Sequence, residues 1–87
     1  MNLSAEISMY PLADEYLPPI SAFIERLNED GGIEVKTNSM STQLFGDYEA
    51  VMALLGAAMK YSFETHGKAI FVSKFLPGDA RILSGYE

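Results

Sequence analysis

The apolar residues of this chain change their spacing along the sequence, and the order of those changes is the strongest constraint on its fold. Residues 3–10 alternate between apolar and polar side chains, which is the period of a strand with one buried face. Residues 20–27 instead carry apolar side chains at helical spacing, and Pro18 and Pro19 suit the first turn of that helix. The first third of the chain therefore predicts a strand followed by a helix.

The alternating period returns in residues 33–37 and again in residues 40–45. Polar Asn38 and Ser39 separate the two stretches, which predicts two antiparallel strands joined by a tight turn. On this pattern Met40 is expected to belong to the core. The middle of the chain thus predicts a hairpin.

A second, longer helix is predicted after the hairpin. Asp47 is a good N-terminal cap, and residues 51–63 carry apolar side chains at helical spacing. His66 and Gly67 are expected to close this helix. Residues 68–75, with the sequence KAIFVSKF, are rich in β-branched and aromatic side chains and predict a final strand.

These elements follow one another in the order β-α-β-β-α-β. This is the order of the ferredoxin-like fold, an α+β sandwich in which a four-stranded antiparallel sheet carries both helices on one face. We assign residues 1–76 to a single domain of this fold, because 87 residues cannot supply two cores. Residues 77–87 show no period and are expected to form an irregular C-terminal tail.

The charges and the residue types argue against several classes of function. Twelve acidic residues against six basic ones give a formal charge of -6, and the scattered basic residues argue against nucleic acid and anionic membranes as partners. The chain has no cysteine, so it has neither disulfides nor thiolate metal sites. The N-terminus lacks the pattern of a secretory signal and no apolar run is long enough to span a membrane, so we expect a cytoplasmic protein.

No catalytic or metal centre is visible in the sequence. The single histidine, His66, stands where a helix is expected to end, and a cation there usually interacts with the helix dipole. No serine is flanked by a suitable base, no cluster of His, Asp and Glu has the spacing of a metal site, and no glycine-rich loop precedes a helix. We therefore expect a protein that is not an enzyme and that uses neither a cofactor nor a metal.

One face of the predicted sheet is turned away from the helices, and we call it the open face. Aromatic rings beside hydroxyl and amide groups can hold a flat heterocycle, because the ring stacks while the amides fix its donors and acceptors. The same groups can instead satisfy a polar interface between subunits, and the residue types alone favour this second interpretation. The residues predicted for the open face are Ser4, Glu6, Ser8, Tyr10, Lys36, Asn38, Ser41, Gln43 and Phe45.

The final strand is largely apolar on both of its faces. Ile70 and Val72 belong to one face and Phe71 and Ser73 to the other, and the sequence does not decide which face meets the helices. A strand with two apolar faces is expected to be covered on both, and in so short a chain the second cover must come from another subunit. We therefore predict self-association.

Three blocks of the sequence, ISMYPL, TNSMSTQLFGDYEAVM and KAIFVSKF, resemble the thiamine-binding, YkoF-like family of small ferredoxin-like proteins. The order of the blocks is similar too, and the resemblance spans residues 7–75. Its most specific part is the Met-Ser-Thr block at residues 40–42 together with Gly46 and Asp47. Members of this family are thought to hold thiamine or its hydroxymethylpyrimidine part without chemistry, and single-domain members assemble as dimers and tetramers.

The resemblance implies a ligand site in this chain. It implies that the ring of Tyr10 stacks on the ligand while Asn38, Ser41 and Thr42 meet the aminopyrimidine edge. The open face and the final strand contribute further candidates. The full set of candidate ligand-binding residues is Tyr10, Asn38, Ser41, Thr42, Ser8, Gln43, Phe71 and Ser73.

Two functions of different classes follow from these observations. The first is a non-catalytic protein that binds thiamine or a related pyrimidine and acts as a homodimer or homotetramer. The alternative is an interaction or regulatory module whose open face serves only to form the oligomer and which has no dedicated ligand. An enzyme on the same fold ranks last, because it needs a histidine or an acid held in a cavity and the sequence offers no obvious candidate.

Overall fold

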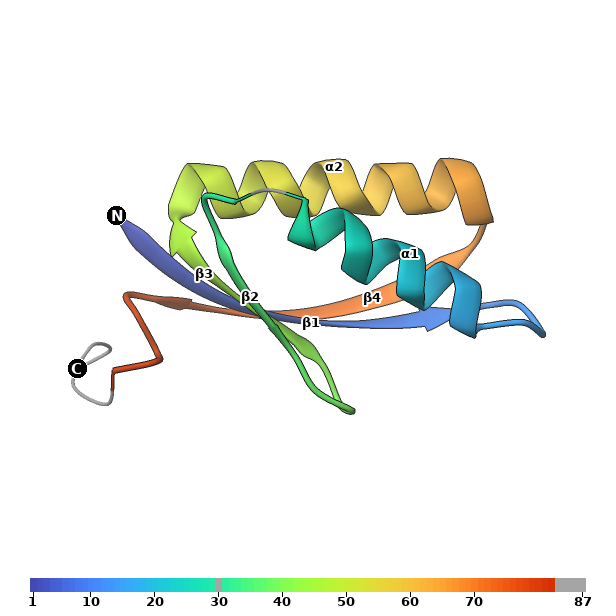
Figure 1. Cartoon of the computed structure of the whole chain (residues 1–87), viewed down its shortest axis with the longest axis horizontal. Helices are drawn as coiled ribbons and strands as arrows, with labels where there is room; N and C mark the ends of the chain where they lie inside the picture. The colour runs from blue at the N-terminus through green and yellow to red at the C-terminus, as the bar shows by residue number, and fades with distance from the viewer. Residues whose placement is uncertain (30, 83–87) are drawn as a thin grey trace.

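The computed structural model describes residues 1–29 and 31–82, and its elements follow the predicted order (Figure 1). Both helices lie on one side of a single four-stranded sheet, as the figure shows. The strand order is β2-β3-β1-β4 and every pair is antiparallel, so the ferredoxin-like prediction is confirmed. The bounds are β1 Asn2–Pro11, α1 Leu17–Asn28, β2 Glu34–Thr37, β3 Thr42–Asp47, α2 Tyr48–His66 and β4 Ala69–Pro77.

Local signals in the sequence set the ends of both helices. Pro18 and Pro19 occupy the first turn of α1, where the missing N–H groups have no intrahelical partner to lose. At the start of α2 the Asp47 carboxylate accepts a hydrogen bond from the N–H of Ala50 at 3.3 Å, as predicted. Gly67 ends α2 with a φ of 86°, a conformation that favours glycine. Neither helix within the described ranges is long and apolar enough to cross a membrane.

The core lies between the helices and one face of the sheet. Leu3, Ala5 and Ile7 point from β1 into this layer, and Leu44 does so from β3. Their spacing of two residues reproduces the alternation seen in the sequence. The helices contribute the buried side chains Phe23, Leu27, Val51, Leu55 and Ala58.

The register of β4 settles which of its two apolar faces meets the helices. The ring of Phe71 lies 4.9 Å from the ring of Phe23 and 5.4 Å from the ring of Phe63, so it belongs to the helix side. Ile70 and Val72 pair with Tyr10 and Ser8 of β1 and therefore lie on the open face. The side chains of Ile70 and Val72 are about half exposed.

The residues of the open face form rows that run across the sheet. One row consists of Lys36, Gln43, Glu6 and Lys74, which are successive partners in the pairing of β2, β3, β1 and β4. The row beside it consists of Glu34, Phe45, Ser4 and Leu76. At the other end of the face β1 pairs with β4 alone, as the Tyr10 and Ile70 pair shows.

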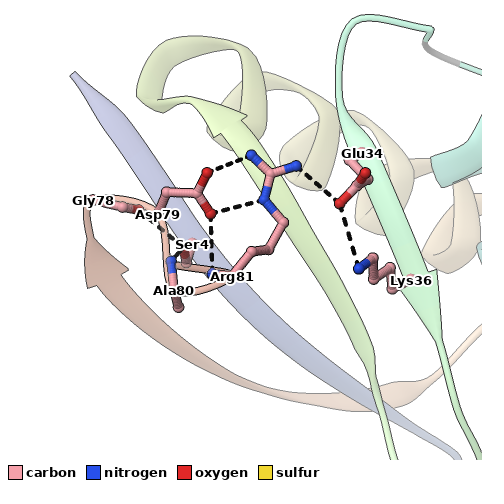
Figure 2. Close-up of polar contacts among 7 residues, drawn as sticks. All are labelled: Ser4, Glu34, Lys36, Gly78, Asp79, Ala80 and Arg81. Atoms are coloured by element: carbon pink, nitrogen blue, oxygen red, sulfur yellow. Dashed lines mark hydrogen bonds and ion pairs between the residues drawn. The ribbon is translucent and has the colours of Figure 1, made fainter. Parts of the chain in front are cut away.

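The C-terminal tail returns across the open face. Gly78 reverses the chain with a φ of 93°, and its N–H donates to the C=O of Asn2 at 2.9 Å. The Ser4 hydroxyl donates to the C=O of Gly78 and accepts from the N–H of Ala80, at 2.9 and 2.8 Å (Figure 2). We call residues 78–82 the strap. Residues 83–87 of the predicted tail lie outside the described residues.

The hairpin of β2 and β3 diverges from the end of β1. Pairing between β1 and β3 stops at Ile7 and Thr42, whereas pairing between β1 and β4 continues to Pro11 and Ala69. The tip of the hairpin therefore projects away from β1 (Figure 1). Met40 lies at this tip and is 85% exposed, so its prediction as a core residue is wrong. The period placed Met40 on the apolar face, but the strand begins only at Thr42.

Candidate functional site

A hollow of about 240 Å³ opens where the hairpin diverges from β1. We call this hollow the notch. Its floor is formed by Ile20, Phe23 and Ile24 of α1. Its walls are the far end of β1, from Ile7 to Tyr10, and residues 37–42 at the hairpin tip. Every one of these lining residues is uncharged, so the notch suits a ligand whose recognised part is neutral.

The Asn38 side chain shapes the hairpin tip. Its Oδ1 accepts hydrogen bonds from the N–H groups of Met40 and Ser41 at 2.8 and 3.0 Å. The backbone N–H of Asn38 also donates to the C=O of Ser41 at 3.0 Å. An Asn side chain that closes a turn in this way leaves its NH₂ group free to donate elsewhere. Asn38 therefore builds the wall of the notch and also offers a donor to it.

The backbone of Met9 points into the notch. Alternate residues of an antiparallel strand direct their N–H and C=O groups to opposite sides. The bonds of Leu12 N–H to Lys68 C=O and of Gly78 N–H to Asn2 C=O show that even-numbered residues of β1 bond to β4. Met9 therefore faces the β3 side, two residues beyond the last paired residue, Ile7. The N–H and the C=O of Met9 therefore point side by side toward the notch.

The remaining groups of the notch are an aromatic ring and hydroxyls. Tyr10 is 54% exposed at the rim, so its ring is accessible for stacking. The Ser8 hydroxyl donates to the C=O of Met40 at 3.3 Å, and the Ser41 hydroxyl donates to Glu6 at 2.9 Å. Thr42 is buried and shares a 3.1 Å hydrogen bond with Thr37. Hydroxyls that are already bonded hold the walls in place.

The candidate residues of the sequence analysis fall into two groups. The structure brings five of them together around the notch, and it places three elsewhere. Phe71 packs among aromatic rings on the helix side, while the Ser73 hydroxyl donates to the C=O of Glu6 at 2.9 Å. Gln43 lies on the open face beside the strap. The five residues at the notch are Ser8, Tyr10, Asn38, Ser41 and Thr42.

Arg81 fastens the strap to the sheet (Figure 2). Its guanidinium donates to Asp79 and also to Glu34 of β2, the latter at 2.9 Å, and it lies 5.0 Å from the centre of the Phe45 ring. These hydrogen bonds lower the pKa of the Glu34 and Asp79 carboxyls below their ordinary values and raise that of Arg81. Phe45, predicted for the open face, is consequently buried at 7% exposure.

The strap roofs a second hollow of about 380 Å³ on the open face, which we call the strap pocket. Its floor is the row of Lys36, Gln43, Glu6 and Lys74, and its far wall includes Leu76. Unlike the notch, it is lined by charged side chains. The two hollows adjoin where Ser41 of the notch donates to Glu6 of the strap pocket.

The described ranges contain no cluster of three His, Asp or Glu residues that could hold a metal ion. His66 ends α2, in agreement with its predicted place at a helix terminus.

Two contributors to the notch were missed by sequence reasoning. The backbone of Met9 was missed because donors and acceptors of the main chain carry no residue signature. A signal did exist, since the first alternating stretch is longer than either strand of the hairpin and must outrun its partner. The apolar floor from α1 carries no signal of a site, because its helical spacing is that of any buried helix face.

Solved structures with the same fold support this architecture. A structural-genomics protein from Streptococcus pneumoniae superposes with a TM-score of 0.84 at 21% identity, covering 97% of this chain and 92% of that one. A Thermotoga maritima protein provisionally assigned to thiamine biosynthesis or salvage gives 0.77 at 14% identity, covering 86% and 82%. A domain of unknown function from Bacillus cereus gives 0.66 at 14% identity, covering 86% and 74%.

No protein-family model matches the chain, and no curated protein does. At identities below 25%, the likeness to these structures establishes the fold alone. The arrangement of strands and helices is therefore shared with a protein provisionally assigned to thiamine metabolism, while the ligand of this chain has to be argued from its own residues.

Proposed function

We propose that this protein is a cytoplasmic, non-catalytic binding protein that holds thiamine or its hydroxymethylpyrimidine part in the notch. The observation that carries the proposal is the open edge of β1 at Met9, which faces an uncharged hollow with an apolar floor. Support for thiamine as the ligand class comes from the sequence resemblance and from the provisional assignment of the Thermotoga maritima neighbour.

The chemistry of an aminopyrimidine fits this edge. Its ring nitrogen accepts a hydrogen bond beside an exocyclic amino group that donates one, so it complements the N–H and C=O of one strand residue. The flat ring has an apolar floor in Ile20 and Phe23 and a stacking partner in Tyr10. The formal charge of -6 favours the thiazolium cation of thiamine over an anionic competitor.

The test is a calorimetric titration of the protein with thiamine and, separately, with hydroxymethylpyrimidine. We expect both to bind, because they share the aminopyrimidine. The Asn38→Asp variant is the sharpest probe, since the carboxylate still accepts from the N–H groups of Met40 and Ser41 but no longer donates to a ligand. We expect about a tenfold loss of affinity, corresponding to one hydrogen bond of ~1.4 kcal/mol.

Asn38→Ala serves as the comparison, because it loses both the turn and the donor. Binding of neither compound at millimolar concentration would contradict the proposal. Equal affinity of wild type and Asn38→Asp would remove Asn38 from the site.

We also propose that the protein works as a homodimer or homotetramer. Ile70, Val72 and Tyr10 expose apolar surface together at the end of the open face that the strap leaves uncovered. The outer edge of β4 is a further contact surface, because a strand of nine residues at a sheet edge readily pairs with another chain.

The same apolar end favours the second candidate function, an interaction module without a ligand. The molar mass from light scattering, measured with and without thiamine and compared with the calorimetric titration, decides between the two functions. We expect Val72→Lys to reduce the molar mass, because burying an unpaired charge opposes association. An oligomer that forms and persists identically with and without thiamine, in a protein that gives no heat with thiamine, would favour the interaction module.

A further inference from the structure

The strap pocket lies outside the notch and calls for a different ligand. Three of the six basic residues of this acidic chain, Lys36, Lys74 and Arg81, line it. Lys36 and Lys74 approach it from the two outer strands, β2 and β4, which are three strand spacings apart, roughly 14 Å. The Lys74 ammonium group reaches along the row toward Glu6, whereas the Lys36 ammonium group reaches along β2 toward Glu34.

The acids around the strap pocket are already engaged. Glu34 accepts from Arg81 at 2.9 Å, Asp79 accepts from Arg81 at 2.7 Å, and Glu6 accepts from the Ser41 hydroxyl at 2.9 Å. Charge-assisted hydrogen bonds of this length are the strong ones. Each of these carboxylates therefore already accepts at least one hydrogen bond from the protein.

The two lysines of the pocket are engaged only in exposed ion pairs. The Lys36 and Lys74 ammonium groups lie 3.8 Å from Glu34 and Glu6, beyond hydrogen-bonding distance, with 60% and 83% of their side chains exposed. Exposed ion pairs of this kind contribute little. Within residues 1–29 and 31–82 the Gln43 carboxamide also has no hydrogen-bond partner. The groups of the pocket that can still donate a hydrogen bond are therefore the two ammonium groups and the Gln43 NH₂ group.

We propose that the strap pocket is a binding site for a small organic anion, a carboxylate or a phosphate carried on a compact apolar body. Lys36, Gln43 and Lys74 supply donors to the anionic group, and Leu76 supplies an apolar wall. Arg81 is not the residue that binds the anion, because its guanidinium is already paired with Asp79 and Glu34. It holds the roof in place. This site is independent of the proposed function of the notch.

The test is a titration of the full chain with benzoate and, separately, with inorganic phosphate, followed by ¹⁵N–¹H NMR. We expect the side-chain amide of Gln43 and the backbone amide of Ala80 to shift, while the amide of Met9 in the notch does not. A response to benzoate but not to phosphate identifies the carboxylate class. The reverse response identifies the phosphate class.

Lys36→Ala is the decisive variant, because Glu34 remains bonded to Arg81 when the lysine is removed. We expect about a tenfold weaker binding of the responding anion, as one charge-assisted hydrogen bond is lost. Lys60→Ala is the matched control, since it removes one exposed lysine of α2 that does not line the pocket. If Lys60→Ala lost the same affinity for the anion, the effect would come from the overall charge of the protein, and the proposal would be overturned. If the side-chain amide signal of Gln43 shifted with neither anion, the proposal would also be overturned.

Discussion

The notch and the strap pocket are two hollows on one sheet, and they differ in the chemistry of their walls. The notch offers an open strand edge, an aromatic ring and neutral polar groups. The strap pocket offers a row of charged side chains beneath an arginine-fastened segment. Ser4 and Tyr10, at the two ends of this surface, are six residues apart on β1, roughly 20 Å.

The difference arises from how long β1 is relative to its neighbours. On the side of the strap, β1 is paired on both edges, and only side chains are available to a ligand. On the side of the notch, β1 has outrun β3 and presents its backbone at Met9. A ferredoxin-like sheet can thus form two kinds of site without changing its topology, and the length of one strand decides which kind lies where.

The largest effect is expected from a change in the floor of the notch. Phe23 is 3% exposed and packs against Phe71, so Phe23→Ala is expected to cost ~3–5 kcal/mol of folding free energy. Urea unfolding measures this loss. Met40→Ala, at the exposed tip, is the control and should leave stability nearly unchanged. If Phe23→Ala left the free energy of unfolding unchanged, the floor of the notch would not be part of the core.

A smaller effect separates the two hollows by their ligands. Tyr10→Ala removes the stacking ring, and we expect about a tenfold loss of affinity for hydroxymethylpyrimidine, corresponding to ~1.4 kcal/mol. Tyr10→Phe keeps the ring and should bind nearly as wild type. Neither variant should alter the response of Gln43 to benzoate. If Tyr10→Ala weakened both ligands equally, the notch and the strap pocket would have to be treated as one site.

The strap is expected to depend on pH. Arg81 lowers the pKa values of Glu34 and Asp79, so their contribution is complete above the ordinary values of 4.5 and 3.8 and is lost as the pH falls. We expect the protection of the Ala80 amide against hydrogen exchange, relative to the intrinsic rate at the same pH, to fall below about pH 4.5 as the strap releases. Arg81→Leu should remove this pH step. If Arg81→Leu still showed a pH step of the same size, the step would have to come from other carboxyls.

The smallest effect is expected in α2, which lines neither hollow. Ser62 is buried in α2, and its hydroxyl has no hydrogen-bond partner among the described residues. Ser62→Ala removes a desolvated polar group, so stability should rise by about 0–1 kcal/mol. Thermal unfolding measures the change, and affinity for either ligand should stay at the wild-type value. A clear loss of stability would indicate that this hydroxyl has a partner in solution.

The fold could be predicted from the sequence because each element carries its own period and its own caps. Pro18 and Pro19, Asp47 and Gly67 lie at the helix ends where local chemistry requires them. The facing of β4 could not be predicted, since both of its sides are apolar. The packing of Phe71 against Phe23 decided it, and that contact spans elements far apart in the sequence.

The candidate site could be predicted in part. Residue types placed Tyr10 and the hairpin tip on the open face, and the family resemblance implied that they meet a ligand. Neither indicated that the carbonyl of Asn38 closes the turn. Nothing in the sequence distinguished Arg81 from the other basic residues. Its role depends on Gly78, which turns the chain back over Phe45 and within reach of Glu34.

The most direct measurement is the NMR signal of the Met9 amide during a titration with hydroxymethylpyrimidine. Because the ligand is expected to accept from this N–H, the Met9 resonance should shift and its hydrogen exchange should slow, with the Ala80 amide of the strap unchanged. Binding that leaves Met9 undisturbed, or that perturbs Ala80 instead, would contradict the assignment of the open β1 edge as the ligand site.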